Sequence, residues 1–454
     1  MIGKCVFEFV REERGGGTVM GLMWFMVLVA ICGLSVDVTD GFRSQTMLQA
    51  TADASALAAV IELPDAPAAV TTAVTYSDSN MPTAKYGTVL RDGDVEIGAW
   101  NMTEHIFIPG AALPDAVRVT ARRSIENDNP VPVSFLRIVG LYDWNVTAYA
   151  IAQRFIPECL TDGLVAGGIV DMSSNNEFSN EICIHGQQGV HLGNGNQFNP
   201  GVKVTMPDLA NDLVTPGGNT DGNPGLVEAM REQYLEPRMV NHVSAIMEDL
   251  LTMKPYVTPS YIDTLAEVII RDEKYNFSDV EPGSVYHIKC APNKNVGIPN
   301  NTVLDSVVIV ADCQIGVGPG VEMSDVVLAS RAETPGGSND GGGNNNSGHG
   351  GAGVENANIN VSSSVVLGKD DGCQPGGGVQ IFSNSSVHFA STTAYNGVQI
   401  VVSGDIDLGA RDEGINGINA QAGGDITLTS NNKFGLCTGG APDLLTVNYY
   451  RLVY

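Results

Sequence analysis

The residues of this sequence most suited to acid–base chemistry are a pair of carboxylates and one histidine. Asp370 and Asp371 are adjacent, and His349 lies between two glycines earlier in the chain. Paired carboxylates with a histidine beside a sugar could act as general acid and base. His349, however, falls within residues 334–353, which are nearly all Gly, Asn, Ser and Asp. We expect a disordered loop there, which cannot hold acid–base geometry, and we therefore predict no enzyme and no catalytic residue.

Candidate metal ligands are scattered along the chain. His185 and His191 lie six residues apart without a nearby third ligand, and Asp405, Asp407 and Asp412 are single acidic residues in turns. Zinc usually takes four protein or water ligands, and calcium takes six to eight oxygens. We therefore predict no metal and no other cofactor, with calcium at the acidic turns as the alternative.

A long apolar segment near the start of the chain must position everything that follows it. Residues 18–36 contain no charged side chain. A membrane-crossing helix needs about 20 mostly apolar residues, so this segment is long enough to cross a bilayer. We predict a transmembrane helix that contains Thr18, Leu22, Trp24, Leu28 and Val36.

The basic residues on either side of this segment predict its orientation. Lys4, Arg11 and Arg14 precede it, and the next basic residue is Arg43. Because an excess of Lys and Arg marks the cytoplasmic side, the N-terminus should be cytoplasmic and the rest of the chain outside. A cleaved signal peptide is the alternative, although the apolar core of such peptides is usually only about 7–15 residues long.

The helix is predicted to continue outside the membrane through residues 37–63. Small and apolar residues recur there at spacings of three and four, which places them on one face of a helix. Small residues on such a face allow two helix backbones to approach closely. We predict a helix-packing interface with other subunits that consists of Gly21, Gly33, Met47, Ala50, Ala54 and Leu57. Pro64 and Pro67 are expected to end the helix.

Four separated features surround this helix in a fixed order. Residues 9–15 form an aromatic-basic-acidic-Arg-Gly lead, the apolar segment follows, Val36 and Asp37 come next, and Gln49 opens a Gln-x-x-x-Asp-Ala-x-Ala-Leu-Ala block. This order resembles the start of the TadE/TadG-like proteins of the Flp (Tad) pilus assembly system. Residues 94–152 resemble the outer domains of that family more loosely. The resemblance implies a pilus assembly component whose partners are other pilin-like Tad subunits and the inner-membrane assembly platform.

The resemblance also implies a location for the chain. A single-pass protein of the inner membrane, with a cytoplasmic N-terminus and its bulk periplasmic or extracellular, would fit it. None of the glycines at 15–17 is followed by Glu as the fifth residue. Cleavage of a pilin-type leader is therefore not expected, and the anchor should be permanent.

Six of the eight cysteines follow the predicted span. An even number in an oxidising compartment indicates disulfides, although six cysteines permit fifteen pairings. No Cys-x-x-Cys spacing supports zinc as the alternative. We favour sequential pairing, that is Cys159 with Cys183, Cys290 with Cys313 and Cys373 with Cys437.

Residues 64–158 are expected to form a small α/β pilin-like domain. Apolar and polar residues alternate over 86–90, 94–98, 116–121 and 144–150, as they do in half-buried strands. Residues 132–141 have Pro near the start and Gly near the end, which predicts a helix.

From residue 159 onward, very short alternating segments are separated by turns rich in Gly and Asn. Many short strands of this kind predict a parallel β-helix, in which each coil stacks its strands on the previous coil. A β-sandwich is the alternative, because the spacing is irregular. Helical spacing over 226–251 predicts a helical insertion within the β-helix. The predicted short strands are residues 182–184, 190–192, 202–204, 307–310, 326–328, 359–361, 365–367, 379–381, 387–389, 398–401, 406–408 and 426–428.

The predicted fold class is therefore α+β with a β-rich C-terminal part: a transmembrane helix that continues as a periplasmic helix, a pilin-like domain, and a right-handed parallel β-helix. The predicted domains are a cytoplasmic tail (1–17), the transmembrane helix (18–36), the extended periplasmic helix (37–63), the TadE/TadG-like domain (64–158), the β-helix (159–446, with the helical insertion 208–283 and the Gly/Asn loop 334–353) and a C-terminal tail (447–454).

The net charge of the chain argues against some classes of partner. The formal net charge is −27, from 51 acidic and 24 basic residues. Such a charge disfavours binding to the phosphates of nucleic acid, so no nucleic-acid partner is predicted. The predicted function is a non-enzymatic, membrane-anchored component of Flp/Tad pilus assembly, minor pilin-like or TadG-like, with a binding domain outside. The alternative is a surface adhesin or carbohydrate-binding β-helix protein that takes a surface or glycan ligand and uses the helix only as an anchor.

Overall fold

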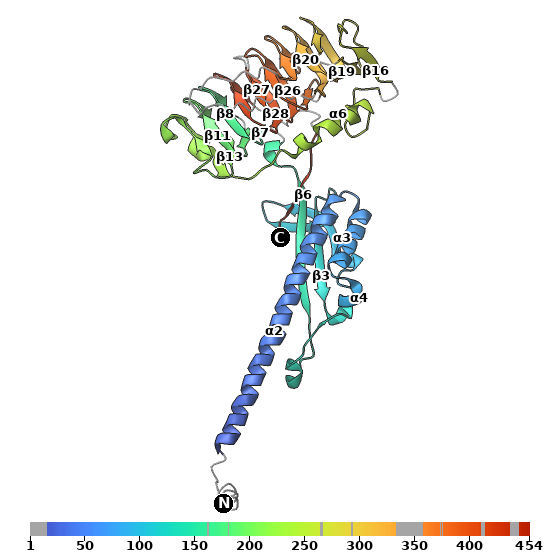
Figure 1. The fold of residues 1–454 in the computed structure, drawn as a ribbon, viewed down its shortest axis with the longest axis vertical. Coiled ribbons are helices and arrows are strands. Elements are labelled where there is room, and N and C mark those ends of the chain that lie inside the picture. Colours follow the sequence, from blue (N-terminus) through green and yellow to red (C-terminus); the bar gives the residue numbers. More distant parts are fainter. Residues whose placement is uncertain are drawn as a thin grey trace, which may run out of the picture. The chain divides into compact units, whose positions relative to one another are not determined.

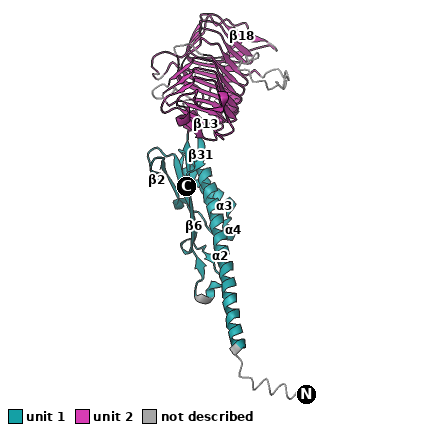
Figure 2. Cartoon of the chain, turned by 90° about the vertical axis from the view of Figure 1, so that its left-hand side faces the viewer, with its two compact units in different colours: residues 1–155, 448–454 teal, residues 156–447 magenta. Residues whose placement is uncertain are grey.

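The structure is a computed structural model that describes residues 16–160, 163–179, 181–263, 267–291, 294–332, 357–372, 374, 376–409, 414–435 and 445–454. The chain forms two compact units (Figure 2). Unit 1 comprises Met1–Phe155 with Asn448–Tyr454, and unit 2 comprises Ile156–Val447. The chain thus passes from unit 1 to unit 2 and returns. The predicted loop 334–353 lies outside the described residues.

One long helix dominates unit 1 (Figure 1). Helix α2 (Gly16–Ile61) has 46 residues, which corresponds to about 69 Å at ~1.5 Å per residue. It ends before Pro64, as predicted. Pro67, however, lies in the first turn of a second helix, α3 (Ala66–Asn80), whose start is capped by the Asp65 carboxylate at 3.0 Å from the Ala68 N–H. A short helix, α4 (Thr83–Tyr86), follows α3, and the strand predicted over 86–90 is not formed, because α4 ends at Tyr86 and residues 87–90 have no regular secondary structure.

An antiparallel sheet packs against α2 and α3. Its strands are β1 (Val95–Asn101), β2 (Ile106–Pro109), β3 (Ala116–Arg123), β6 (Val146–Phe155) and β31 (Tyr449–Leu452), in the order β2-β1-β3-β6-β31. Strand β31 corrects the prediction of a C-terminal tail over 447–454, because its backbone pairs with the free edge of β6 from Tyr449 opposite Phe155 to Leu452 opposite Ala152. Short 3₁₀ turns η1 (Asp92–Asp94) and η2 (Ile125–Asn127) connect these elements.

A hairpin between β3 and β6 replaces the helix predicted over 132–141. Strands β4 (Val131–Pro132) and β5 (Asp143–Trp144) pair antiparallel, and the 3₁₀ turn η3 (Leu136–Val139) closes the loop between them. Figure 1 shows this hairpin extending beside α2 beyond β3 and α4. The helix prediction was wrong because Asp37 of α2 binds three backbone N–H groups of the hairpin.

Unit 2 is built from short strands that alternate between two parallel sheets, of fifteen and nine described strands. Strands β7, β10 and β13 lie in the larger sheet, whereas β8, β11 and β14 lie in the smaller one. In chain order the strands are β7 (Gly163–Ala166), β8 (Ile169–Met172), β9 (Glu177–Phe178), β10 (Cys183–Gly186), β11 (Gly189–Leu192), β12 (Gln197–Phe198), β13 (Lys203–Met206), β14 (Leu213–Val214), β15 (Met230–Glu232), β16 (Ile269–Asp272), β17 (Ser284–Lys289), β18 (Asn295–Ile298), β19 (Val303–Ala311), β20 (Gln314–Val317), β21 (Glu322–Ser330), β22 (Ile359–Val361), β23 (Val366–Leu367), β24 (Val379–Ser383), β25 (Val387–Phe389), β26 (Ala394–Val402), β27 (Ile406–Leu408), β28 (Ile415–Ala422), β29 (Ile426–Leu428) and β30 (Lys433–Gly435).

The order of these strands in space differs from their order in the chain. The larger sheet runs β15-β13-β10-β7-β28-β26-β23-β21-β19-β17-β16. The chain therefore starts in the middle at β7, proceeds to one end at β15, crosses to the other end at β16, and returns until β28 pairs with β7 (Figure 1). The N-terminal and C-terminal halves of unit 2 thus form one continuous sheet.

A segment of short helices covers the outer face of the larger sheet. This strap (residues 237–262) contains η6 (Arg238–His242) and α6 (Val243–Leu251), and its apolar side chains pack on outward-facing residues of β17, β19, β21, β24 and β26. Strands such as β19 and β21 end in continuous apolar residues because one face fills the interior and the other lies under the strap. Among the described residues no helix covers the smaller sheet in this way, and its strands keep the alternating burial seen in β25, β27 and β29.

The helical insertion predicted over 208–283 is helical only in part. It contains α5 (Leu226–Ala229), the strap helices and a 3₁₀ turn η5 (Pro216–Gly218), but β14, β15 and β16 within it belong to the sheets. Another 3₁₀ turn, η4 (Glu158–Leu160), precedes β7. The helical spacing over 226–251 is confirmed at α5 and α6, but the helix is interrupted between them because Met230–Glu232 pairs in register with β13.

Polar and aromatic side chains stack from one layer of unit 2 to the next. The Asn432 N–H donates to Asn176 Oδ1, the Asn176 N–H to Asn196 Oδ1, and the Asn196 N–H to Asn223 Oδ1, each at 2.9 Å. Their neighbours Phe434, Phe178 and Phe198 form a stack with ring centroids 4.8 and 5.2 Å apart. The asparagine side chains provide hydrogen-bond partners for buried backbone N–H groups of the turns, and the phenylalanine rings fill the interior between layers.

Candidate functional site

The first part of α2 presents an apolar surface in every direction. All side chains from Val19 to Cys32 are exposed, and Trp24 and Phe25 expose 60% and 63% of their surface. Among the described residues, α2 is the one helix that is long and apolar enough to cross a membrane. Such a surface is favourable in lipid and unfavourable in water, which suits this part of α2 to anchor the chain in a membrane.

Farther along, one face of α2 lies under the hairpin. A Cβ added to Gly33 would lie 2.7 Å from Phe135 Cβ, and one added to Gly41 would lie 2.2 Å from the Trp144 ring. Asp37 lies halfway between these glycines, and residues four apart share one helix face. We name Gly33, Asp37 and Gly41 the hairpin stripe. Its two glycines let aromatic rings of the hairpin rest directly on the helix backbone.

Asp37 holds the hairpin through its carboxylate. The Ser134 N–H donates to Oδ1 at 2.9 Å, and the Phe135 and Leu136 N–H groups donate to Oδ2 at 2.8 and 2.7 Å. Only 4% of Asp37 is exposed. Burial raises the pKa of the Asp37 carboxyl, but these three N–H groups and the charge of Arg137 outweigh it, so that the pKa lies below its ordinary value. The Val-Asp of the sequence pattern thus has a structural role within unit 1.

The predicted packing face of α2 occupies a different side of the helix. Ala50 is exposed, whereas Met47, Ala54 and Leu57 are half-buried at the edge of the unit 1 core. Ile61, in line with them, is 54% exposed. We call this set the open face. It is one side of the extended helix that the rest of unit 1 leaves partly uncovered.

The two predicted packing glycines have different surroundings. Nothing lies within 4 Å of a Cβ added to Gly21, so this glycine faces open space. Gly33 instead receives Phe135 of the same chain, and the close approach predicted there is made within unit 1. The sequence signal for this internal packing, which our prediction missed, is the regular spacing of Gly33, Asp37 and Gly41.

The paired carboxylates line a cavity in unit 2. Asp370 and Asp371 border a space of about 630 Å³ together with Asp305, Glu322 and Asp325. The Asp325 carboxylate accepts the Gly377 N–H at 2.6 Å, and that of Asp371 accepts the Gln374 N–H at 3.0 Å. His349 lies outside the described residues. Asp371 thus binds its own loop, and Asp325 binds a turn 52 residues away in the chain. No histidine in the described part of the chain lines the cavity with them.

The predicted metal candidates do not converge. His185 lies in the larger sheet and is fully buried, with Nδ1 2.8 Å from Thr205 Oγ1 and Nε2 3.1 Å from Gln187 Oε1. Burial lowers the pKa of this histidine. His191 lies in the smaller sheet, beside Asp171 of the next strand. In the residues that the structure describes, no three His, Cys, Asp or Glu side chains are grouped so that they could hold a metal ion.

The acidic turn residues stabilise neighbouring layers. Asp405 Oδ1 accepts the Asp425 N–H at 2.8 Å, and Asp407 Oδ2 lies 2.9 Å from His388 Nδ1. Asp412 lies outside the described residues. Asp405 and Asp407 thus have protein partners, and each contributes to the stacking of strands rather than to an open ligand set.

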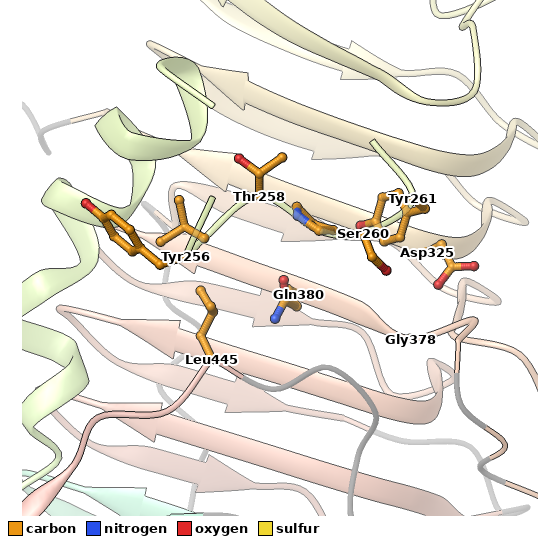
Figure 3. A pocket seen from close by; sticks show the side chains of 10 residues that line it. Tyr256, Thr258, Ser260, Tyr261, Asp325, Gly378, Gln380 and Leu445 are labelled. Atoms are coloured by element: carbon orange, nitrogen blue, oxygen red, sulfur yellow. The ribbon is translucent and has the colours of Figure 1, made fainter. Parts of the chain in front are cut away.

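A smaller cavity lies where the strap meets the larger sheet (Figure 3). Its volume is about 210 Å³, and its lining includes Tyr256, Tyr261, Asp325, Gln380 and Leu445. Figure 3 shows the Gln380 side chain between the strap and Leu445. Aromatic rings beside amide and carboxylate groups could contact a small polar ligand. No local sequence signal reveals this cavity, because its walls come from distant segments.

Two disulfides lie in unit 2, Cys159–Cys183 and Cys290–Cys313. They are two of the three predicted pairs. Cys373 and Cys437 lie outside the described residues. Each observed bond joins residues on successive layers, because Cys183 pairs with Gly163 beside Cys159, and Cys313 follows β19 beside β17. Disulfides of this kind persist in oxidising compartments.

Comparison with known families assigns both units. Residues 163–438 match the family described as domain of unknown function DUF7867. Residues 45–152 match a family model described as Tad-like Flp pilus-assembly, and residues 15–69 match one described as Flp pilus-assembly TadE/G-like. No curated protein matches the chain. The latter two matches cover α2, the open face, strands β1, β2 and β3 and most of β6. The chain therefore belongs to the DUF7867 family, and through its N-terminal region it is a TadE/TadG-like protein of the Flp (Tad) pilus system.

Proposed function

We propose that this chain is a non-enzymatic, membrane-anchored component of Flp/Tad pilus assembly, a minor pilin-like or TadG-like subunit. The observation that supports this most is the surface of α2. An apolar helix exposed on all sides leads into the open face, where Ala50 and Ile61 remain exposed although the opposite face is buried. Helices of partner subunits could pack along this surface, because its small residues allow close approach.

The proposed topology is a single pass through the inner membrane with the N-terminus in the cytoplasm and both units outside. Lys4, Arg11 and Arg14 before the span support this orientation. The two disulfides of unit 2 support an oxidising location such as the periplasm. The membrane platform and other pilin-like Tad subunits are the proposed partners.

Unit 2 is proposed to be a right-handed parallel β-helix. Its support is the regular spacing of partners in successive strands: His185 contacts Thr205 20 residues later, Asp405 contacts Asp425 20 residues later, and Gln380 contacts Gln399 19 residues later. In a parallel β-helix, each coil has about this length and contributes one strand to each of the parallel sheets. The proposed role of this stiff acidic body is to bind a surface or ligand outside the cell.

A photo-crosslinking amino acid in place of Ala50 tests the assembly role. In cells that produce Flp pili, it should capture another Tad subunit, identified by mass spectrometry. The matched control is the same amino acid at Thr75, an exposed small residue on α3 of the same unit. Equal or absent capture at the two positions would contradict the proposal.

A surface adhesin or glycan-binding protein that uses α2 only as an anchor is the second candidate. The observation in its favour is the pair of cavities on unit 2 that share Asp325. Replacing residues 156–447 by a short Gly/Ser linker separates the two roles, provided that β31 is retained to pair with β6. Loss of attachment with normal pili would favour the adhesin, and loss of pili would favour assembly.

A further inference from the structure

The turn of the unit 1 hairpin carries apolar side chains that the described chain leaves partly exposed. We name residues 135–142 the hairpin tip. Its sequence, Phe-Leu-Arg-Ile-Val-Gly-Leu-Tyr, contains one charged residue. Phe135, Leu141 and Tyr142 expose 44%, 49% and 61% of their surfaces. Exposed apolar residues gathered on one turn mark a surface that contacts either another macromolecule or lipid.

The contacts of the tip fix its position along α2. The Asp37 carboxylate binds the N–H groups of Phe135 and Leu136, and Phe135 rests on Gly33. Gly33 lies three residues before the end of the apolar span at Val36, which places it about 4.5 Å inside the span at ~1.5 Å per residue. A tip attached at this height is level with the outer end of the membrane-crossing segment.

The chemistry of the tip suits the interface of a lipid bilayer. Interfacial segments bury apolar side chains about 5–10 Å deep, at the boundary between headgroups and acyl chains. Tyr and Trp gather at this level because their rings are apolar and their polar groups can reach water. Tyr142 and Trp144 stand on the same strand end of the hairpin. Arg137 can extend from the turn towards headgroup phosphate.

From these contacts we propose that the hairpin tip inserts into the outer interface of the membrane that α2 crosses, as a second attachment of unit 1 to the bilayer. The inference rests on the proposed span of α2. Its consequence is mechanical: with α2 and the tip both in lipid, unit 1 has two points of attachment and cannot rotate freely about the helix axis. The open face of α2 would then keep a fixed direction relative to the membrane.

Fluorescence quenching in reconstituted full-length protein tests this insertion. Leu141→Cys carries an environment-sensitive fluorophore in phosphatidylcholine vesicles that contain lipids with a nitroxide near the headgroup or near the chain end. The background carries serine in place of Cys5, Cys32, Cys373 and Cys437. The headgroup-proximal nitroxide should quench the Leu141 label about threefold more than the deep one, as expected for an interfacial depth.

The matched control is Leu113→Cys with the same label. Leu113 is 88% exposed, and it precedes β3 at Ala116, the end of the sheet opposite the hairpin, which joins the Arg123 end. The Leu113 label should be quenched from water and not from lipid. If the Leu141 label behaves like the Leu113 label, the insertion is wrong.

A third label at Met26 distinguishes a tip that stays out of the membrane from an α2 that does not cross it. Met26 lies in the apolar part of α2 and is 56% exposed. If its label is quenched by the deep nitroxide while the Leu141 label is not, α2 crosses the membrane and the tip does not enter it. If the Met26 label is not quenched, the proposed anchor itself is refuted, and the tip proposal with it. Because the vesicles contain no other protein, lipid quenching at Leu141 cannot come from a partner subunit.

Discussion

Helix α2 carries two faces that differ in what covers them. The hairpin stripe is occupied by the chain itself: Phe135 rests on Gly33, Trp144 rests on Gly41, and Asp37 binds three backbone N–H groups between them. The open face, with Ala50 at its centre, is lined by small and apolar residues of the same general type but meets no equivalent partner in the described chain.

The comparison shows that residue type alone does not distinguish internal packing from packing between subunits. Both faces use residues without bulky polar groups, and both repeat at helical spacing. What separates them is the buried acid. A carboxylate at 4% exposure needs fixed donors, and here the hairpin of the same chain supplies three backbone N–H groups. The face with the acid is therefore internal, and the face without one is the face that we propose for partners.

The largest expected effect on the stability of unit 1 comes from filling the hairpin stripe. Gly41→Leu would place its side chain where the Trp144 ring lies, 2.2 Å from the added Cβ. Overpacking of this kind costs about 1–3 kcal/mol, and we expect about 2 kcal/mol from the free energy of unfolding. The three tryptophans, Trp24, Trp100 and Trp144, all belong to unit 1, so their fluorescence during denaturation in detergent follows this unit.

Gly21→Leu is the matched control for this substitution. The same change is made on the same helix, but nothing lies within 4 Å of the added Cβ. The denaturation midpoint should not fall. An equal loss of stability in both variants would mean that the helix itself, and not the contact between Trp144 and Gly41, determines the effect.

Removing the buried acid should release the hairpin while the sheet stays folded. Asp37→Ala leaves the N–H groups of Ser134, Phe135 and Leu136 without their acceptor. We expect amide hydrogen exchange at these positions to accelerate at least about tenfold, since local opening then exposes them. Asp40→Ala, three residues along on an exposed position, should leave exchange unchanged. Unchanged exchange in Asp37→Ala would show that the ring contacts alone hold the hairpin.

Lowering the pH should have a smaller effect on the stability of unit 1. The pKa of folded Asp37 lies below the ordinary value, so the folded state favours the ionised form more than the unfolded state does. This contribution to stability is complete above the ordinary pKa, about 3.9, and is lost as pH falls through the lower folded value. The environment of Trp144, followed by fluorescence after Trp24→Phe and Trp100→Phe, should therefore change below about pH 4. The same transition in an Asp37→Asn variant would assign it to another group.

Much of the fold follows from local patterns. The apolar run and its small-residue continuation predict α2, and alternation predicts β1, β3 and twelve of the 24 described strands of unit 2, because these signals depend on neighbours in the chain. The hairpin was predicted as a helix from its Pro and Gly alone, whereas its backbone N–H groups bind Asp37 and Phe135 rests on Gly33, about a hundred positions away. Helix α3 was not predicted. Pro67 was expected only to end α2, but it lies in the first turn of α3, which the Asp65 side chain caps.

The strand order of unit 2 could not be predicted for a related reason. The strands of both parallel sheets are similarly short and apolar, so the sequence does not indicate which strand lies beside which. The pairing of β7 with β28 joins Leu164 to Ala420, and nothing between these positions marks it. The disulfides were easier, because each closes a short interval of 24 or 23 residues between successive layers.

The smallest expected effect on stability belongs to the open face. Ala50→Leu enlarges an exposed side chain and should change the free energy of unfolding of unit 1 by no more than about 0.5 kcal/mol. Ala52→Leu, two residues away and fully buried, should destabilise unit 1 by about 1–3 kcal/mol. The two variants thus make the same substitution once at an exposed position and once at a buried position of α2.

Counting pili in cells that carry each variant completes this comparison. If partner helices pack on the open face, Ala50→Leu should reduce pilus number although the protein is as stable as the original, because a leucine keeps two helix backbones farther apart. A full complement of pili in Ala50→Leu would remove the open face from the assembly mechanism. A stable protein without pili can be explained only by a lost contact outside the chain, since every contact within unit 1 would be intact.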